Sequence, residues 1–122
     1  MQELGFDEAS RAENVRRAAH LALLLNSNAI HAIVAMISPA ASARAAAYSV
    51  IGLDRCKEIY ERTPIVVCEL RDPKGLYARA RANPLAQMTG IQAPYQPPQS
   101  PALRIDTSTV GLNEAVQLLL HA

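Results

Sequence analysis

An apolar run at residues 29–37, which contains the single polar residue His31, most constrains what this chain can fold into. The run lies between two segments with helical patterns, residues 7–25 and 41–50. Continuous apolar runs of this length are typical of strands buried on both faces of a parallel sheet. The run is far shorter than the ~20 residues that span a bilayer, so it does not predict a transmembrane helix. The sequence therefore predicts a buried strand between two helices.

The first helical segment carries its own start signal. Ser10 and Glu13 form a capping box near its beginning. Apolar residues then recur at spacings of three and four, which is the periodicity of one helix face: Val15, Ala18, Ala22 and Leu25. We expect a helix over residues 7–25 that ends at the Asn26-Ser27-Asn28 break.

The remaining segments continue the alternation of helix and strand. Weaker strand patterns occur at residues 57–60 and 103–106, and helices are predicted from Thr63-Pro64, with proline in the first turn, and over residues 112–120. Five of the eight prolines fall between residues 84 and 101, which predicts an ordered loop or lid. Alternating elements favour an α/β fold with a mostly parallel sheet. A length of 122 residues predicts one domain over residues 1–122.

Charge and cysteine content exclude several functions. Twelve basic and eleven acidic residues give a net charge of +1, which offers no electrostatic footprint for nucleic acid. The first twenty residues lack the apolar segment of a secretory signal, so we expect a cytoplasmic protein without membrane contact. Cys56 and Cys68 form no CxxC pair, and no metal site is predicted. The only lysines, Lys57 and Lys74, do not lie in a GxxxxGK[ST] phosphate loop.

Four local segments rise above this background. They are Leu4-Gly5-Phe6 with Arg11 and Glu13-Asn14, Met36-Ile37-Ser38-Pro39, Arg71-Asp72-Pro73-Lys74-Gly75-Leu76-Tyr77, and Thr89-Gly90-Ile91 with Pro94-Tyr95. In this order and at these spacings they resemble the motifs of the adenylyl-sulfate kinase family, over nearly the whole chain. The resemblance implies a P-loop kinase-like fold, a three-layer α/β/α arrangement with a mostly parallel sheet that is incomplete at the N-terminus. Residues 72–101 would form its lid and loop region.

The resemblance also implies an activity. The family phosphorylates the 3′-hydroxyl of adenosine 5′-phosphosulfate (APS) to give 3′-phosphoadenosine 5′-phosphosulfate (PAPS) in sulfate assimilation, with MgATP as co-substrate. By resemblance, Phe6 would stack on the adenine of APS, Arg11 would bind the phosphosulfate, and Asn14 would hydrogen-bond the substrate. An anionic nucleotide with a flat base calls for such groups. From the residues alone, Phe6 can equally be a hydrophobic staple and Arg11 a solvated helix charge.

The later motifs supply the remaining candidates. Ser38 matches the family's phosphate-accepting serine, and Ile37 matches a neighbour that lines the substrate pocket; a serine before proline is otherwise a strand-ending turn residue. Lys74 matches the lid lysine, although Asp-Pro-Lys-Gly is also a good type I turn. Met88 stands where the family has an aromatic residue against the substrate base. Arg79 and Arg81, which follow Lys74, are expected to form a solvated face of the lid.

Family members place a strand, a phosphate loop and a second strand before the Leu-Gly-Phe segment, whereas the printed sequence has Met1-Gln2-Glu3 there. Phosphoryl transfer depends on that positioning machinery, so we expect these residues alone not to make a competent kinase. We also expect unpaired sheet edges. The alternative function is a non-catalytic, pseudokinase-like module that binds a sulfonucleotide or another subunit. The expected partners are APS and either a second copy of the chain or a complete kinase or sulfurylase subunit.

Overall fold

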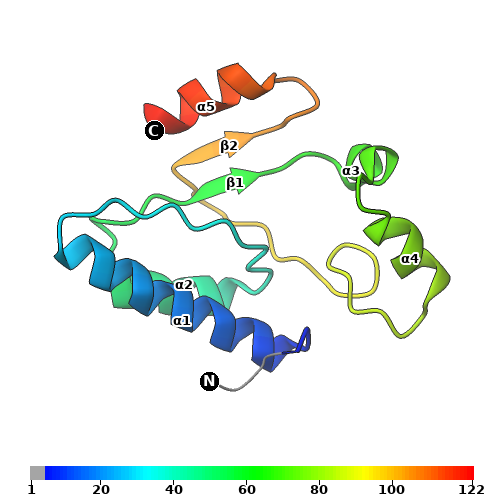
Figure 1. Ribbon diagram of the computed structural model, residues 1–122, viewed down its shortest axis with the longest axis horizontal. Coiled ribbons are helices and arrows are strands. Elements are labelled where there is room, and N and C mark those ends of the chain that lie inside the picture. Colours follow the sequence, from blue (N-terminus) through cyan, green and yellow to red (C-terminus); the bar gives the residue numbers. More distant parts are fainter. Residues whose placement is uncertain (1–4) are drawn as a thin grey trace. The chain divides into compact units, whose positions relative to one another are not determined.

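Helices and strands fall in two units of the chain, Met1–Cys56 and Lys57–Ala122 (Figure 1). The structure is a computed structural model that describes residues 5–122. The first unit holds α1 (Glu8–Ser27) and α2 (Ala41–Ile51). The second holds β1 (Ile59–Glu61), α3 (Ile65–Arg71), α4 (Leu76–Ala82), β2 (Leu103–Ile105) and α5 (Leu112–Leu120). The single domain expected over residues 1–122 stays a prediction, because each unit is described by itself.

Helix α1 forms where the sequence predicts it, but its cap is a different residue. Asp7 is the N-cap, and its carboxylate accepts hydrogen bonds from the Ser10 backbone N–H at 2.9 Å and the Ser10 hydroxyl at 2.7 Å. The predicted capping box of Ser10 and Glu13 is therefore wrong. Asp7 lies three residues before Ser10 and accepts the Ser10 N–H that Glu13 would accept in the predicted box, whereas Glu13 pairs with arginines further along the helix.

Helix α1 packs against α2 through small side chains. Val15 and Ala19 of α1 and Ala47 of α2 form the buried cluster of this unit, and each is less than a tenth exposed. Partly buried apolar residues pack around the cluster: Met36, Ala43, Val50 and Ile51. Alanine at the contact lets the two helix backbones approach closely, and Figure 1 shows the helices side by side.

Residues 29–37 do not form the buried strand that the sequence predicts. They have no regular secondary structure, and Ala29 begins the run with a positive φ of 59°. A strand requires a neighbour for its backbone N–H and C=O groups, and within residues 5–122 no segment forms a ladder with this run. Four of its apolar side chains are at least half exposed: Ile30, Ile33, Val34 and Ile37.

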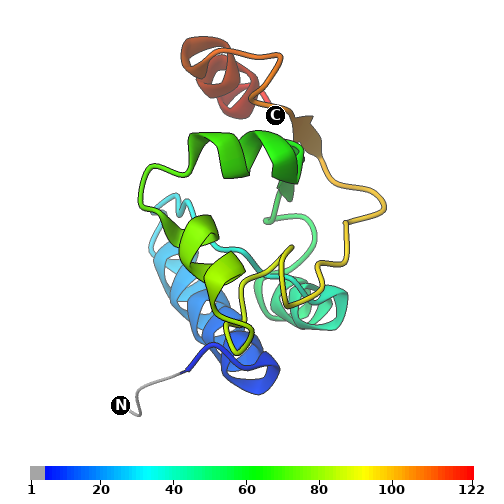
Figure 2. The ribbon, with the colours of Figure 1, turned by 90° about the vertical axis from the view of Figure 1, so that its right-hand side faces the viewer.

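The second unit contains a two-stranded parallel sheet. β1 pairs with β2 in the register Ile59 to Leu103 and Glu61 to Ile105, so the parallel arrangement expected of the fold is confirmed for these strands. β1 begins two residues later than the predicted strand at 57–60. Helices α3 and α4 follow one another in the connection between the strands (Figure 2). Pro64 is the N-cap of α3 and precedes its first turn.

Helix α5 occupies the predicted residues and closes the chain. Its N-cap is Gly111. The Lys57 ammonium donates a hydrogen bond to the Ala122 backbone oxygen, which ties the end of the chain to the segment that leads into β1. No helix within residues 5–122 is both long and apolar enough to cross a membrane.

Candidate functional site

Phe6 and Arg11, two of the predicted substrate-binding residues, are in contact at the start of α1. The guanidinium carbon of Arg11 lies 5.9 Å from the centre of the Phe6 ring, and its Nε donates to the Phe6 carbonyl at 2.7 Å. These residues occupy the two positions that a hydrophobic staple would join, with a cation in place of the second apolar side chain. The Phe6 ring remains 77% exposed. The pair thus presents an aromatic face next to a positive charge, which suits an anionic aromatic ligand.

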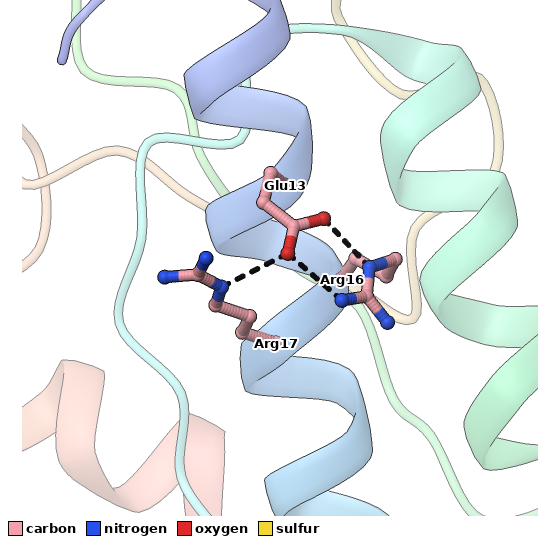
Figure 3. Close-up of polar contacts among 3 residues, drawn as sticks. All are labelled: Glu13, Arg16 and Arg17. Carbon is pink, nitrogen blue, oxygen red and sulfur yellow. Dashed lines mark hydrogen bonds and ion pairs between the residues drawn. The ribbon is translucent and has the colours of Figure 1, made fainter. Parts of the chain in front are cut away.

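One turn further on, Glu13 binds two arginines. Its carboxylate accepts from Arg16 Nε at 2.6 Å and from Arg17 Nε at 2.9 Å, and Figure 3 shows it held between the two guanidinium groups. Hydrogen bonds from Arg16 and then Arg17 lower the pKa of Glu13 to about 2. Asn14 is exposed beside this triad and lies three residues after Arg11, so the two are neighbours on the helix surface.

Ile37 and Ser38 end the apolar segment immediately before α2. Ile37 is 57% exposed. Ser38 is partly buried and has a positive φ of 45°, and its backbone carbonyl accepts a hydrogen bond from Arg44 Nη1 at 2.6 Å. The predicted phosphate acceptor, Ser38, therefore has a left-handed backbone conformation, and Arg44 of α2 hydrogen-bonds to its carbonyl.

Lys74 lies in a tight turn between α3 and α4. Asp72 accepts from the backbone N–H groups of Tyr77 and Ala78, at 3.1 Å each, and so caps α4 from outside. Arg79 donates to the carbonyls of Lys74 at 2.8 Å and Gly75 at 3.2 Å. Lys74 itself is exposed. Hydrogen bonds fix the backbone of this turn, while the Lys74 side chain is exposed. An exposed ammonium group on a fixed turn is able to contact an anionic ligand.

Helices α3 and α4 are joined by an ion pair. Arg81 Nη2 lies 2.6 Å from Glu69 Oε1, and this hydrogen bond lowers the pKa of the Glu69 carboxyl and raises that of Arg81. Arg79 and Arg81 are exposed, as expected, but both also make specific hydrogen bonds. Desolvation, followed by the neighbouring Cys68, raises the pKa of the Tyr77 hydroxyl.

Met88 begins a compact loop that Gln92 attaches to α4. The Gln92 amide nitrogen donates to the carbonyls of Ala80 and Asn83, and its oxygen accepts from the Met88 backbone N–H at 3.2 Å. Gly90 has a φ of 86°, and a Cβ there would lie 3.0 Å from Ile65 Cδ1. The loop is thus held by α4 through Gln92 and lies against α3 at Gly90.

The carboxyl ends of β1 and β2 carry a further polar cluster. The Thr63 and Thr107 hydroxyls lie 2.8 Å apart, and the Thr107 backbone N–H donates to Thr63 Oγ1. Arg71 donates to the Thr107 hydroxyl at 2.6 Å and to its carbonyl at 2.9 Å. These contacts fasten the end of α3 to the edge of the sheet at which α/β proteins place their ligands.

Known proteins of one family match most of this chain. The family model for adenylylsulphate kinase matches residues 1–106. The chain belongs to the adenylylsulphate kinase family. The adenylyl-sulfate kinase of Phocaeicola vulgatus is 46% identical over 118 residues, which are 97% of this chain and 58% of that protein. The adenylyl-sulfate kinase of Pseudomonas entomophila is 44% identical over 94% of this chain and 55% of its own length.

Solved structures show the same relationship. The structure of the Mycobacterium tuberculosis APS kinase CysC in complex with AMPPNP and APS superimposes with a TM-score of 0.89 at 43% identity, covering 97% of this chain and 69% of that one. The crystal structure of APE1195 gives a TM-score of 0.84 at 32% identity, covering 97% and 67%. The α/β fold of this adenylylsulphate kinase family member is therefore of the P-loop kinase type. The chain spans little more than half the length of the curated relatives named above.

The predicted site residues of this family member fall in both units. Phe6, Arg11, Asn14, Ile37 and Ser38 belong to the first unit, and Lys74 and Met88 belong to the second. Sequence reasoning missed Arg44 and Gln92, which contact the backbones of Ser38 and Met88, and it assigned Arg79 only to a solvated face, although Arg79 also donates to the Lys74 carbonyl. Arg44 did carry a signal, because it is the one charged residue in an alanine-rich helix. Gln92 had none, since an exposed glutamine in a loop is unremarkable in a sequence.

The family resemblance implies MgATP as co-substrate, which calls for a phosphate loop and a magnesium ion. Within residues 5–122 no three His, Cys, Asp or Glu side chains gather so as to hold a metal ion, and the printed sequence has no GxxxxGK[ST] segment. No step through magnesium is assigned to the described residues.

Proposed function

We propose that this chain forms the sulfonucleotide-binding and lid portion of an adenylyl-sulfate kinase. The reaction transfers the γ-phosphoryl group of ATP to the 3′-hydroxyl of APS, which gives ADP and PAPS. The match that extends over 97% of the chain, to a kinase whose solved structure holds both AMPPNP and APS, is the observation that carries the proposal. We assign the reaction to sulfate assimilation and to the cytoplasm, where its phosphoryl donor ATP is available.

The start of α1 supports the substrate part of this proposal. The exposed Phe6 ring offers a stacking face for adenine, and the guanidinium of Arg11 lies beside it, where it can reach an anionic phosphosulfate. Asn14, on the same region of the helix, supplies an amide that can hydrogen-bond the nucleotide. Three different groups of one ligand can thereby be bound by residues that lie within the segment 6–14.

The remaining candidates take their roles from the family resemblance. In the first unit, the Ser38 hydroxyl would take the γ-phosphoryl group as ADP leaves and pass it to the 3′-hydroxyl of APS, which restores the serine, and Ile37 lines the pocket beside it. In the second unit, the family resemblance makes Lys74 the lid lysine, whose positive charge suits anionic groups of a nucleotide, and puts Met88 in place of an aromatic ring. Met88 provides apolar contact without the flat face, so it binds the base through packing alone.

Calorimetry with APS tests the binding part directly. We expect heat of binding on titration of the folded chain with millimolar APS. Binding should be at least about tenfold weaker in Phe6→Ala and in Arg11→Ala, each of which removes one ligand contact. Arg55→Ala is the matched control, because Arg55 is exposed and lies outside these motifs. No heat from a folded sample, or equal weakening in the control, contradicts the proposal.

The second candidate function is a non-catalytic module that binds a sulfonucleotide or docks on another subunit. The exposed apolar side chains of residues 30–37 favour it, because surfaces of this kind mark interaction sites. A coupled assay for PAPS separates the two functions. Turnover by the purified chain refutes the module. Co-purification with a complete kinase or sulfurylase subunit, or formation of a homodimer, without turnover supports it.

A further inference from the structure

Ser38 has a backbone conformation that serine rarely adopts. Its φ is 45°, in the left-handed region that favours glycine, and the next residue is Pro39, whose ring further restricts the backbone before it. Such a conformation persists only when surrounding contacts hold it, and it recurs at functional sites. The contacts of Ser38 therefore decide where its hydroxyl points.

Arg44 makes such a contact from inside the first unit. It is 8% exposed and is the one buried charged or polar residue among those described. Long side chains on a helix point back toward its N-terminus, which directs Arg44 toward the residues just before α2. Its Nη1 donates to the Ser38 carbonyl at 2.6 Å. Burying a guanidinium is costly unless it is hydrogen-bonded, so this contact is built into the core rather than added at the surface.

We infer that Arg44 is the positioning residue that holds Ser38 in its left-handed conformation. By fixing the Ser38 carbonyl, the buried guanidinium fixes the Ser38–Pro39 peptide unit and, with it, the backbone from which the Ser38 side chain projects. The catalytic meaning of this orientation rests on the proposed function, whereas the conformational link between the two residues does not.

The experiment measures the conformation of Ser38 by NMR. A residue with positive φ gives a strong nuclear Overhauser effect between its own amide and α protons. In Arg44→Met, which keeps an unbranched apolar stem but is shorter and removes the donor, we expect this signal of Ser38 to weaken to the level of extended residues. Arg44→Lys, which restores a donor, should recover part of it. Arg55→Met is the matched control and should leave Ser38 unchanged. An unchanged signal in Arg44→Met overturns the inference.

A second pair of variants covers the case in which Arg44→Met unfolds the chain. Glycine adopts a positive φ without strain, so a Ser38→Gly chain has no strain to release when the guanidinium is removed, whereas Ser38 recovers part of the lost stability by leaving its strained conformation. We therefore expect the loss of stability caused by Arg44→Met to be about twofold larger in the Ser38→Gly background than in the wild-type background. An equal loss in both backgrounds shows that Arg44 acts through burial alone and overturns the inference.

The two proposals fail in distinguishable ways. If the wild-type chain gives no heat with APS while the Ser38 signal still disappears in Arg44→Met, the proposed function fails and the inference about Arg44 stands. If APS binds and Arg44→Met leaves the Ser38 signal intact, the inference fails and the proposed function stands.

Discussion

At the residue scale, charged side chains of this protein act mostly on nearby backbone or on charges one turn away. Asp7 caps α1, Asp72 caps α4, and Glu13 binds two arginines of its own helix. The hydrogen bonds to Asp7 and Glu13 favour the charged form of these two carboxylates and lower their pKa values. Exposed ion pairs of this kind contribute little to stability individually, so their effect is on local geometry.

Glu13 provides a prediction about pH. Its carboxyl should titrate near pH 2, because Arg16 and Arg17 donate hydrogen bonds to its ionised form. A pKa below the ordinary value of 4.5 means that the paired carboxylate stabilises the folded chain above pH 4.5 and that this contribution is lost as the pH falls toward 2. Arg16→Gln should raise the pKa only part of the way, because Arg17 remains.

The measurement is an NMR titration of the Glu13 side-chain carboxyl carbon in both proteins. Arg55→Gln serves as the control, since Arg55 lies in the segment after α2 and outside α1. A midpoint for Glu13 near 4.5 in the wild-type chain would show that the two arginines do not hold this carboxylate in solution.

At the element scale, two contacts hold neighbouring elements together: α1 packs against α2, and Gln92 attaches the loop that begins at Met88 to α4. Ala19 is 3% exposed, and with Ala47 it allows α1 and α2 to approach closely. In the second unit, one glutamine side chain satisfies carbonyls near the end of α4 and an N–H of the following loop. Helix ends leave such carbonyls without intrahelical donors. The Gln92 side chain supplies the donor here and so holds its own loop against the end of α4.

Enlarging Ala19 should separate the helices of the first unit. We expect Ala19→Leu to lower the free energy of unfolding by about 1–3 kcal/mol, because the larger side chain overpacks a close helix contact. Urea unfolding followed by circular dichroism measures this. Ala46→Leu, on an exposed position of α2, is the matched control and should change stability little. Equal effects of the two substitutions would mean that α1 does not pack on α2 at Ala19.

Changing Gln92 to Glu should release the Met88 loop from α4. The substitution keeps the size and the acceptor for Met88 but removes the donor to Ala80 and Asn83 and places a negative charge beside their carbonyls. We expect local destabilisation of about 1–3 kcal/mol. Hydrogen exchange should become faster at the amides of residues 88–93.

Gln117→Glu on exposed α5 is the control for the added charge and should leave these amides unaffected. Exchange that is unchanged in Gln92→Glu would show that the loop is held by its other contacts, including Gly90 against Ile65.

At the scale of the whole molecule, the chain has few fully buried residues and many exposed apolar ones. Six apolar residues are buried among those described, Val15, Ala19, Ala22, Ala47, Ala80 and Ile105. The segment at 29–37 leaves large side chains in solvent, Ile33 at 84% exposure. Exposed apolar segments without a paired backbone favour self-association, so solubility is the property most sensitive to this region.

Two isoleucines test this distribution. Ile33→Lys should change the free energy of unfolding by no more than about 0.5 kcal/mol and should raise solubility, because the side chain is already in solvent. Ile105→Lys, at a position 3% exposed in β2, should cost more than about 3 kcal/mol or prevent folding. Urea unfolding and static light scattering measure both properties. A large loss of stability in Ile33→Lys would mean that residues 29–37 are covered in solution.

Sequence alone determined the parts of this protein that depend on neighbouring residues. The α/β class, the helices near residues 7–25, 41–50 and 112–120, the loop rich in proline and the family motifs all follow from local spacing and composition. Periodicity and turn chemistry act over a few residues, so they can be recognised without knowing the fold.

Only the tertiary structure decided which groups meet across the chain. Residues 29–37 have the composition of a strand, but a strand exists only when a second segment pairs with it. Asp7 and Ser10 are both good caps, and their geometry determined which one accepts the hydrogen bonds. The attachments of Arg44 to Ser38 and of Gln92 to α4 join residues through contacts that no local pattern encodes. Such contacts depend on competition among many hydrogen-bond partners, which is resolved when the chain packs.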